Sequence, residues 1–201
     1  MFKKASDFYK SLTFTDFIRK VIFYLCDRLS FKLYRKLKAA YYFKNSGIKL
    51  GSNVKIHGLC YNVSVGKNVS FYDNSLFEFG SKSHLVIGDE CVLSYGVLIA
   101  VNDTVTIGDH VQIGEYTSVR DTTHRHDDVD KPMKFAGDVS TPIAIGNDVW
   151  IGRGCIIQPG TIIENGVVIG ANSVVKGTLM KNGIYAGSPA KLLKMRAQDV
   201  V

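Results

Sequence analysis

A polar segment, residues 120–141, carries the side chains best suited to proton transfer. It reads RDTTHRHDDVDKPMKFAGDVST and contains two of the five histidines, His124 and His126. An imidazole ring can accept a proton from a hydroxyl group near neutral pH and return it later, as a general base does. A nearby carboxylate can orient the ring, and Asp121 and Asp127 are the candidates. The alternative is that both histidines are solvated loop residues.

Metal chemistry is not expected from this sequence. A zinc site needs three or four converging ligands, and the remaining histidines and the cysteines show no such spacing. The other histidines are His57, His84 and His110, which we expect on the surface. The cysteines are Cys26, Cys60, Cys91 and Cys155, which we expect to be small buried thiols.

The chain around the polar segment repeats with a period of six residues. The aliphatic positions are Ile145, Ile151, Ile157, Ile163, Ile169 and Val175. The fourth residue after each of the first five is small or β-branched: Val149, Cys155, Thr161, Val167 and Ser173. The same pattern precedes the polar segment, with shifts of phase that indicate loops.

A period of six excludes an amphipathic helix, whose apolar positions recur every 3.6 residues. Six contains an even number of pleats, so the aliphatic residue of every hexad faces the same side. Short strands joined by glycine-containing turns can then stack as a parallel solenoid. Three hexads per coil and about seven coils predict a triangular prism roughly 30–35 Å tall. An ordinary sandwich of short strands would not need so many aliphatic positions in phase.

Three stretches in the repeat resemble the left-handed β-helix acetyltransferases, most closely those that acetylate sugar hydroxyls. They are PIAIGNDVWIGRG from residue 142, IGANSVV from residue 169 and AGSPAK from residue 186. The resemblance covers about residues 49–195. It implies an all-β solenoid, a left-handed parallel β-helix of hexapeptide repeats. The period alone does not give the left-handed sense.

The resemblance also implies roles for residues on the acceptor side. The family's catalytic histidine matches His124, with His126 as the rival. From the residues themselves we expect Asp121 to orient the imidazole; the alternative is that Asp121 simply forms a turn. Trp150, the single tryptophan, would wall the acceptor pocket, and His126 would lie beside it. The alternative for Trp150 is surface packing or a subunit contact.

On the donor side, the resemblance implies acetyl-CoA as acyl donor and no metal. The family's coenzyme A contacts fall on Arg153, Ala171, Lys176, Lys191 and Lys194. Ala171 would offer its backbone amide to the pantetheine arm, and the lysines would reach phosphates. Arg153 stands where related enzymes often carry a small residue.

The N-terminal segment differs from the rest in charge. The first 50 residues hold twelve Lys or Arg and three Asp, whereas the whole chain has a net charge of +7. Residues 8–45 have the apolar spacing of one or two amphipathic helices. Such a segment can cap the first coil or lie on an anionic membrane surface. No nucleic-acid-binding motif accompanies the charge.

These observations predict three parts. Residues 1–48 form a basic amphipathic helical segment, residues 49–185 the β-helix with the inserted loop 120–142, and residues 186–201 a C-terminal turn followed by a short helix or tail. No leader peptide or membrane-spanning run is apparent. We expect a homotrimer in the cytoplasm, and peripheral contact with the inner face of the cell membrane is an open alternative.

The leading functional hypothesis is an acetyl-CoA-dependent O-acetyltransferase. Its acceptor would be a sugar of a surface polysaccharide, a glycolipid or a precursor of either. Two alternatives stay open: an N-acetyltransferase for an amino sugar or an antibiotic, and a β-helix scaffold without catalytic activity. A β-helix carbonic anhydrase fits poorly, since its histidines are spaced differently. The N-terminal segment is too short for a serine acetyltransferase.

Overall fold

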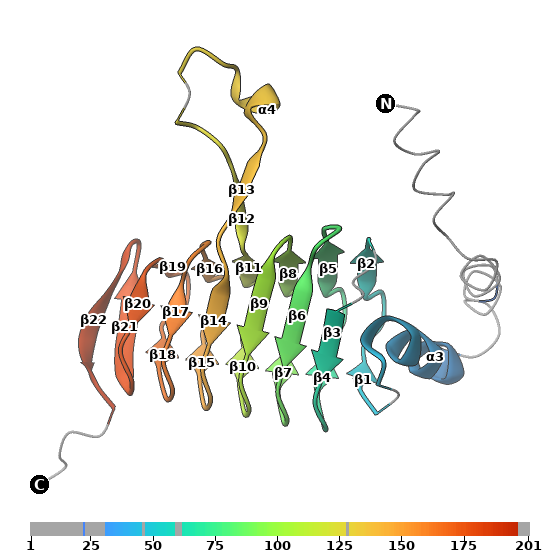
Figure 1. Ribbon diagram of the computed structural model, residues 1–201. Helices are drawn as coiled ribbons and strands as arrows, with labels where there is room; N and C mark the ends of the chain where they lie inside the picture. Colours follow the sequence, from blue (N-terminus) through green and yellow to red (C-terminus); the bar gives the residue numbers. More distant parts are fainter. Residues whose placement is uncertain (1–21, 23–30, 46, 59–61, 128, 197–201) are drawn as a thin grey trace, which may run out of the picture.

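The computed structural model describes residues 22, 31–45, 47–58, 62–127 and 129–196. Most of these residues belong to one prism built from three parallel sheets, with helix α3 at one end and a hairpin arm projecting from its side (Figure 1). Within the described part of the chain, no helix is both long and apolar enough to cross a membrane.

Each coil contributes one short strand to each of the three sheets. The first sheet contains β1 (Lys49–Leu50), β4 (Ser70–Phe71), β7 (Val92–Leu93), β10 (Gln112–Ile113), β15 (Trp150–Ile151), β18 (Val168–Ile169), β21 (Gly183–Gly187) and β22 (Ala190–Met195). The second sheet contains β2 (Lys55–His57), β5 (Leu76–Phe79), β8 (Leu98–Val101), β11 (Ser118–Arg120), β16 (Ile156–Ile157) and β19 (Val174–Val175). The third sheet contains β3 (Asn62–Val65), β6 (His84–Ile87), β9 (Thr104–Ile107), β14 (Ile143–Ile145), β17 (Ile162–Ile163) and β20 (Thr178–Leu179).

The predicted β-helix is therefore confirmed, and its hand follows from the path of the chain. In Figure 1 the chain descends along the front sheet, passes the lower edge and returns up the rear sheet while advancing from right to left. This path is left-handed, as the resemblance implied.

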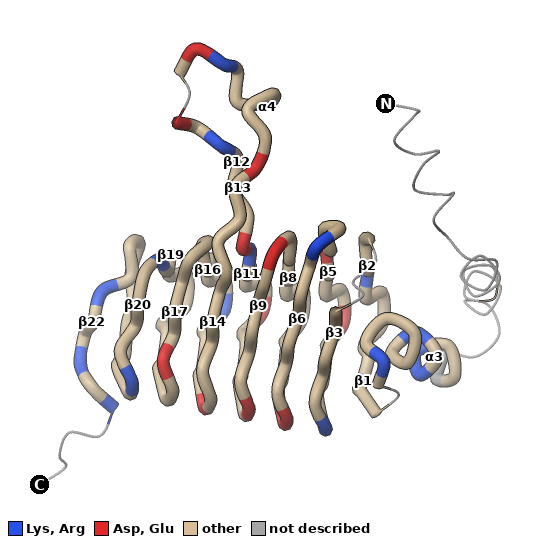
Figure 2. Tube along the Cα trace, in the orientation of Figure 1, with Lys and Arg blue, Asp and Glu red and all other residues tan. Residues whose placement is uncertain are grey.

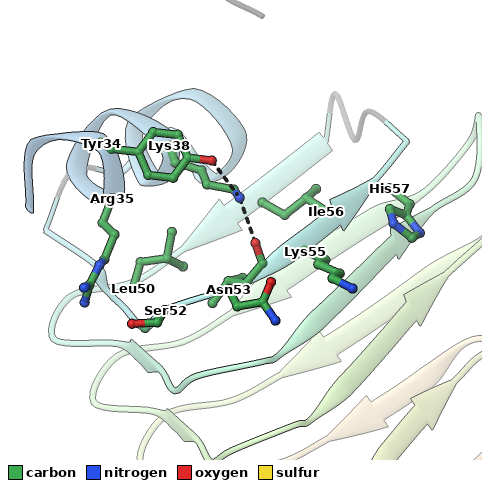
Figure 3. A pocket seen from close by; sticks show the side chains of 11 residues that line it. Tyr34, Arg35, Lys38, Leu50, Ser52, Asn53, Lys55, Ile56 and His57 are labelled. Carbon is green, nitrogen blue, oxygen red and sulfur yellow. Dashed lines mark hydrogen bonds between the residues drawn. The ribbon is translucent and has the colours of Figure 1, made fainter. Parts of the chain in front are cut away.

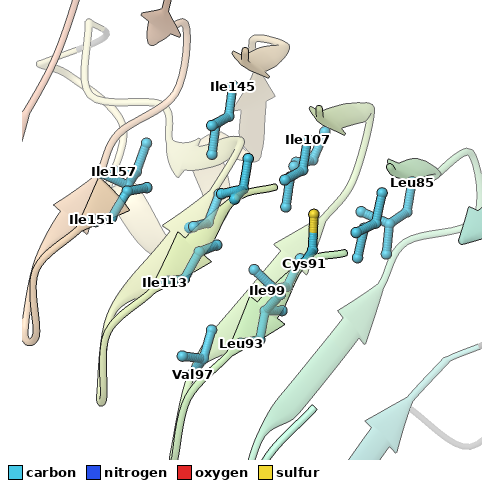
Figure 4. Close-up of a cluster of buried hydrophobic side chains, with 14 of the residues drawn as sticks. Leu85, Cys91, Leu93, Val97, Ile99, Ile107, Ile113, Ile145, Ile151 and Ile157 are labelled. Carbon is cyan, nitrogen blue, oxygen red and sulfur yellow. The ribbon is translucent and has the colours of Figure 1, made fainter. Parts of the chain in front are cut away.

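The aliphatic residue of each hexad fills the centre of the prism (Figure 4). All six predicted positions from Ile145 to Val175 are buried, and so are the five paired small residues. The register stacks like on like, because Ile145 lies between Ile107 and Ile163 in the third sheet. Since each coil covers the one before it, the repeat forms one continuous core.

Tight corners allow the coils to stack at strand spacing. At Gly114 an added Cβ would lie 2.5 Å from the backbone nitrogen of Arg153 in the next coil, and at Gly152 it would lie 2.6 Å from that of Ala171. Only glycine fits at such an approach. The glycine that follows the aliphatic residue is thus explained by contact between coils.

Helix α3 (Phe31–Phe43) packs on the open end of the first coil. Ala39 and Phe43 are buried there, and the Phe43 ring lies 5.0 Å from the rings of both Phe71 and Phe77. This contact covers apolar surface that the first coil would otherwise expose. The helix predicted over residues 8–45 is observed for 31–43, while residues 1–21 and 23–30 lie outside the described residues.

At the other end, residues 190–195 form strand β22 in place of the expected helix or tail. The strand pairs antiparallel with β21, with Ala186 opposite Lys191 and Ile184 opposite Lys194. An antiparallel strand ends the parallel stack and pairs the backbone groups of β21, which is why it forms here.

The polar segment is a hairpin arm rather than a shapeless loop. Strands β12 (Thr122–His124) and β13 (Asp138–Ser140) pair antiparallel and carry the short helix α4 (Met133–Ala136) beyond them. The amide of Thr141 donates to the carbonyl of Asp121, at 2.8 Å, where the arm leaves and rejoins the prism. The histidines therefore stand on an ordered extension of the second sheet.

Candidate functional site

The arm brings His124 together with a carboxylate that the sequence analysis did not single out. His124 and Asp138 face each other in the β12–β13 pair, and His124 Nδ1 lies 2.7 Å from Asp138 Oδ1. With this contact at Nδ1, the other ring nitrogen, Nε2, is left to take a proton from a substrate. The His124 side chain is 80% exposed, so a substrate can reach it.

The expected role of Asp121 is wrong in this structure. Its side chain is fully buried, and its two carboxylate oxygens accept hydrogen bonds from the backbone amides of Asn102 and Asp103 at 2.9 and 2.8 Å. The hydroxyl of Thr122 donates to it as well. A carboxylate engaged in this way anchors the base of the arm and does not orient His124.

His126 stands beside His124 without taking its place. Its Nδ1 lies 3.1 Å from the backbone carbonyl oxygen of His124. The neighbouring Asp127 carboxylate lies 3.5 Å from the Arg125 guanidinium. Neither side chain forms a hydrogen bond or ion pair with the His124 ring within the described residues, whereas Asp138 does.

Two of the predicted donor-side residues, Arg153 and Ala171, line one groove along the first sheet, here called the donor groove. Its volume is about 560 Å³, and it is lined mainly by apolar side chains. Trp150, Arg153 and Ala171 all line it, with the half-exposed Trp150 ring on its wall. Trp150 was expected on the acceptor side. Within one chain, however, it lies beside the donor-side residues Arg153 and Ala171.

Two backbone amides in the donor groove have no acceptor in the described part of the chain. They belong to Arg153 and Ala171, at equivalent corners of successive coils. At another corner the corresponding amide of Asp89 donates to the Asp109 carboxylate at 2.7 Å. The coil that follows Ala171 offers no such side chain, so these amides can donate to a ligand.

Basic residues lie along β22, the strand beside β21 (Figure 2). Lys191 and Lys194 lie opposite groove residues Ala186 and Ile184 in the β21–β22 pair. Lys176 is different, because it lies between β19 and β20, at the corner of the second and third sheets. The structure thus gathers four of the five predicted donor-side residues and leaves Lys176 apart.

A second groove, here called the arm groove, runs along the second sheet from His57 to the base of the arm. Its volume is about 280 Å³, and its upper end is formed by Thr122 and Asp138. Glu78 and Arg120 lie in its lining and form an ion pair at 2.9 Å. The arm groove was not predicted, because its residues come from separate coils.

The two grooves lie on different parts of the prism. The donor groove follows the first sheet, along the lower edge in Figure 1, whereas the arm leaves the prism between β11 and β14 at its upper edge. One chain therefore presents the histidine and the donor groove at separate places. No group of three His, Cys, Asp or Glu side chains within the described residues could hold a metal ion.

Comparison with known proteins gives a consistent picture. A family described as bacterial transferase hexapeptide (six repeats) matches residues 142–177. The chain is 32% identical over 183 residues to the Escherichia coli K12 protein named "Putative lipopolysaccharide biosynthesis O-acetyl transferase WbbJ", covering 89% of this chain and 87% of that protein. It is 35% identical to galactoside O-acetyltransferase of the same organism, covering 65% and 63%.

A solved structure extends the similarity to three dimensions. It is a hexapeptide-repeat acetyltransferase from Vibrio cholerae O1 biovar eltor, complexed with acetyl coenzyme A. The TM-score is 0.61 and the identity 26%, over 90% of this chain and 86% of that one.

Proposed function

The chain belongs to the hexapeptide-repeat acetyltransferases, and from that premise we propose that it moves an acetyl group from acetyl-CoA to a sugar hydroxyl. The sugar would belong to a surface polysaccharide, a glycolipid or a precursor of either. The observation that carries the proposal is the exposed His124 ring held by Asp138 at 2.7 Å. The relatives named for sugar O-acetylation support the choice of acceptor.

In the proposed reaction His124 acts first as a base and then as an acid. Nε2 takes the hydroxyl proton while the hydroxyl oxygen attacks the thioester carbonyl. The resulting tetrahedral intermediate expels the sulfur, which receives the proton from the imidazolium. The products are the acetyl ester and free coenzyme A. Asp138 stabilises the imidazolium between the two steps, because its carboxylate is 2.7 Å from the positive ring.

Coenzyme A would lie along the donor groove. The backbone amides of Arg153 and Ala171, unpartnered among the described residues, can donate hydrogen bonds to carbonyl oxygens of its pantetheine arm. Lys191 and Lys194 can attract its phosphates. Apolar lining and a few polar donors are typical of a cofactor site. Arg153 also brings a cation with no ion pair among the described residues.

The separation of His124 from the donor groove favours assembly of several copies of the chain. We propose a homotrimer with three copies around a common axis. Each arm would then reach the donor groove of its neighbour, with Trp150 closing the shared site. The end of the arm supports this arrangement, since Val129, Met133 and Phe135 are more than 60% exposed. Apolar side chains on a projecting arm are suited to pack against another copy.

Thiol release tests the proposed function directly. The full chain is incubated with acetyl-CoA and a panel of sugars, amino sugars and antibiotics, and free coenzyme A is followed with a thiol reagent. We expect release that depends on a sugar hydroxyl and falls about 10²-fold or more in His124→Ala. His126→Ala is the matched control and should keep most of the activity. Release only with amines would replace the proposal by N-acetylation.

A further inference from the structure

A cavity between α3 and the first coil has the composition of an anion site (Figure 3). It has a volume of about 280 Å³, and we call it the cap cavity. Among the described residues, its cationic lining side chains are Arg35 and Lys38 from α3 and Lys55 from β2, and no Asp or Glu lines it. Three cations around one hollow without a carboxylate attract a multiply charged anion.

Two of these cations have no neutralising partner within the described residues. Arg35 and Lys55 form no ion pair or hydrogen bond with the described part of the chain, and Arg35 is half-buried. Lys38 is held in place, since its Nζ donates to the Val54 carbonyl oxygen at 2.7 Å. A cation drawn partly out of water gains most from an anion that binds beside it.

The cap cavity adjoins the arm groove, because His57 lines both. From His57 the register of the second sheet runs through Glu78 and Ala100 to Arg120. Three strand spacings of about 4.8 Å make this row about 14 Å long. The row ends below Asp138, the partner of His124, so a ligand in the cap cavity can extend to the reacting histidine.

The arm groove itself is suited to sugar rings. The Glu78–Arg120 ion pair spans the small, buried Ala100, which leaves a polar depression between the two ends of the row. Glu78 can accept hydrogen bonds from hydroxyl groups, and the guanidinium of Arg120 can donate to ring or hydroxyl oxygens.

We propose that the acceptor is a glycan carrying a phosphate or diphosphate, with its sugars in the arm groove and its phosphate in the cap cavity. This inference rests on the proposed function and narrows its substrate class. The phosphate can belong to a soluble nucleoside diphosphate sugar or to a lipid-linked diphosphate sugar, which present the same group to Arg35, Lys38 and Lys55.

Binding of inorganic pyrophosphate tests the cavity apart from catalysis. The full chain is titrated by calorimetry with saturating coenzyme A present, so that the donor groove is occupied. We expect the double variant Arg35→Gln/Lys55→Gln to bind pyrophosphate at least about tenfold more weakly than the wild type. This is the scale for loss of hydrogen bonds to a charged group. Lys36→Gln is the matched control, because Lys36 is exposed on the same helix and does not line the cavity. Equal affinity in the double variant and the wild type would overturn the proposal.

Kinetic measurements distinguish the soluble from the lipid-linked diphosphate sugar. They also separate failure of this proposal from failure of the proposed function. Thiol release is measured with a free sugar, with its uridine diphosphate derivative, and with its prenyl diphosphate derivative in phosphatidylcholine vesicles. We expect one phosphorylated acceptor to have a KM about tenfold or more below that of the free sugar, a preference lost in the double variant. Equal KM for free and phosphorylated sugars contradicts the proposal while leaving the acetyltransferase intact. If coenzyme A binds but no acceptor reacts, the proposed function fails instead.

Discussion

His124 and Asp138 occupy directly opposed positions on two antiparallel strands, with Nδ1 and Oδ1 2.7 Å apart. Fourteen residues of sequence separate them, and the turn of the arm brings them together. The pair stands on a hairpin that is tied to the prism by a hydrogen bond from the Asn102 side-chain amide to the hydroxyl of Ser140, at 2.8 Å. Within the hairpin, the hydroxyl groups of Thr122 and Ser140 lie 2.9 Å apart and form a further hydrogen bond. The ring is therefore fixed in orientation although it is largely exposed.

Asp138→Asn should slow the reaction without unfolding the protein. The amide still fits but no longer carries the charge that stabilises the imidazolium. Because both side chains are more than half exposed, water screens the pair, and we expect kcat to fall only about three- to tenfold. Steady-state kinetics measure kcat, and thermal unfolding should give an unchanged Tm. Asp127→Asn, which touches Arg125 instead, is the control; a kcat for Asp138→Asn equal to that of wild type would remove Asp138 from the mechanism.

Asp121→Ala should act on stability. The substitution leaves the amides of Asn102 and Asp103 without their carboxylate acceptor at a fully buried position. Both hydrogen bonds are partly buried, so we expect the free energy of unfolding to fall by about 1–3 kcal/mol in total. Denaturant unfolding provides the measurement. An unchanged midpoint in Asp121→Ala would show that this carboxylate does not anchor the arm.

Gly152→Ala should loosen the coils at the donor groove. The new Cβ would lie 2.6 Å from the Ala171 nitrogen, so the two coils must move apart. Overpacking of this kind costs about 1–3 kcal/mol. We also expect weaker binding of coenzyme A by calorimetry, since the Ala171 amide moves. Gly47→Ala is the control, because its Cβ would meet only the Asn45 side chain at 3.2 Å; similar losses in both variants would argue against a local effect.

Lys191→Ala/Lys194→Ala should raise the KM for acetyl-CoA with little change in kcat. The two ammonium groups are proposed to meet phosphates, which take no part in the bond changes. Exposed charges contribute modestly, so we expect an increase of about three- to tenfold that shrinks at high salt. 3′-Dephospho-coenzyme A supplies a second readout: discrimination against it should weaken in the variant, and unaltered discrimination would place that phosphate elsewhere.

Cys91 and Cys155 should resist thiol reagents in the folded protein. Burial raises the pKa of both thiols, so at a given pH less of the reactive thiolate is present than for a free cysteine. Modification should therefore increase with pH only above the ordinary thiol range, or after unfolding. Mass spectrometry of labelled peptides would detect this. Rapid labelling of either residue at neutral pH would contradict the burial seen here.

The sequence by itself determined the solenoid and its core. A six-residue period with alternating side chains places Ile145, Ile151 and Ile157 in the core, independently of the exact turn geometry. The alternation of side-chain direction is local and recurs in every hexad. The sequence also showed that residues 120–141 interrupt the repeat and contain two histidines. The donor-side positions Arg153 and Ala171 fall in one groove for the same reason: hexads eighteen residues apart lie at the same corner of successive coils.

Only the tertiary structure decided which carboxylate meets His124 and where an acceptor can lie. Asp121 is nearer in sequence, but the chain bends at the base of the arm and buries it, while antiparallel pairing brings Asp138 opposite the ring. The arm groove draws on residues from four separate coils, and the cap cavity forms only where α3 covers the first one. Periodicity predicts which side chains point inward. The juxtaposition of outward-facing side chains depends on loop lengths, on register and on the packing of non-repetitive segments, which a local repeat does not encode.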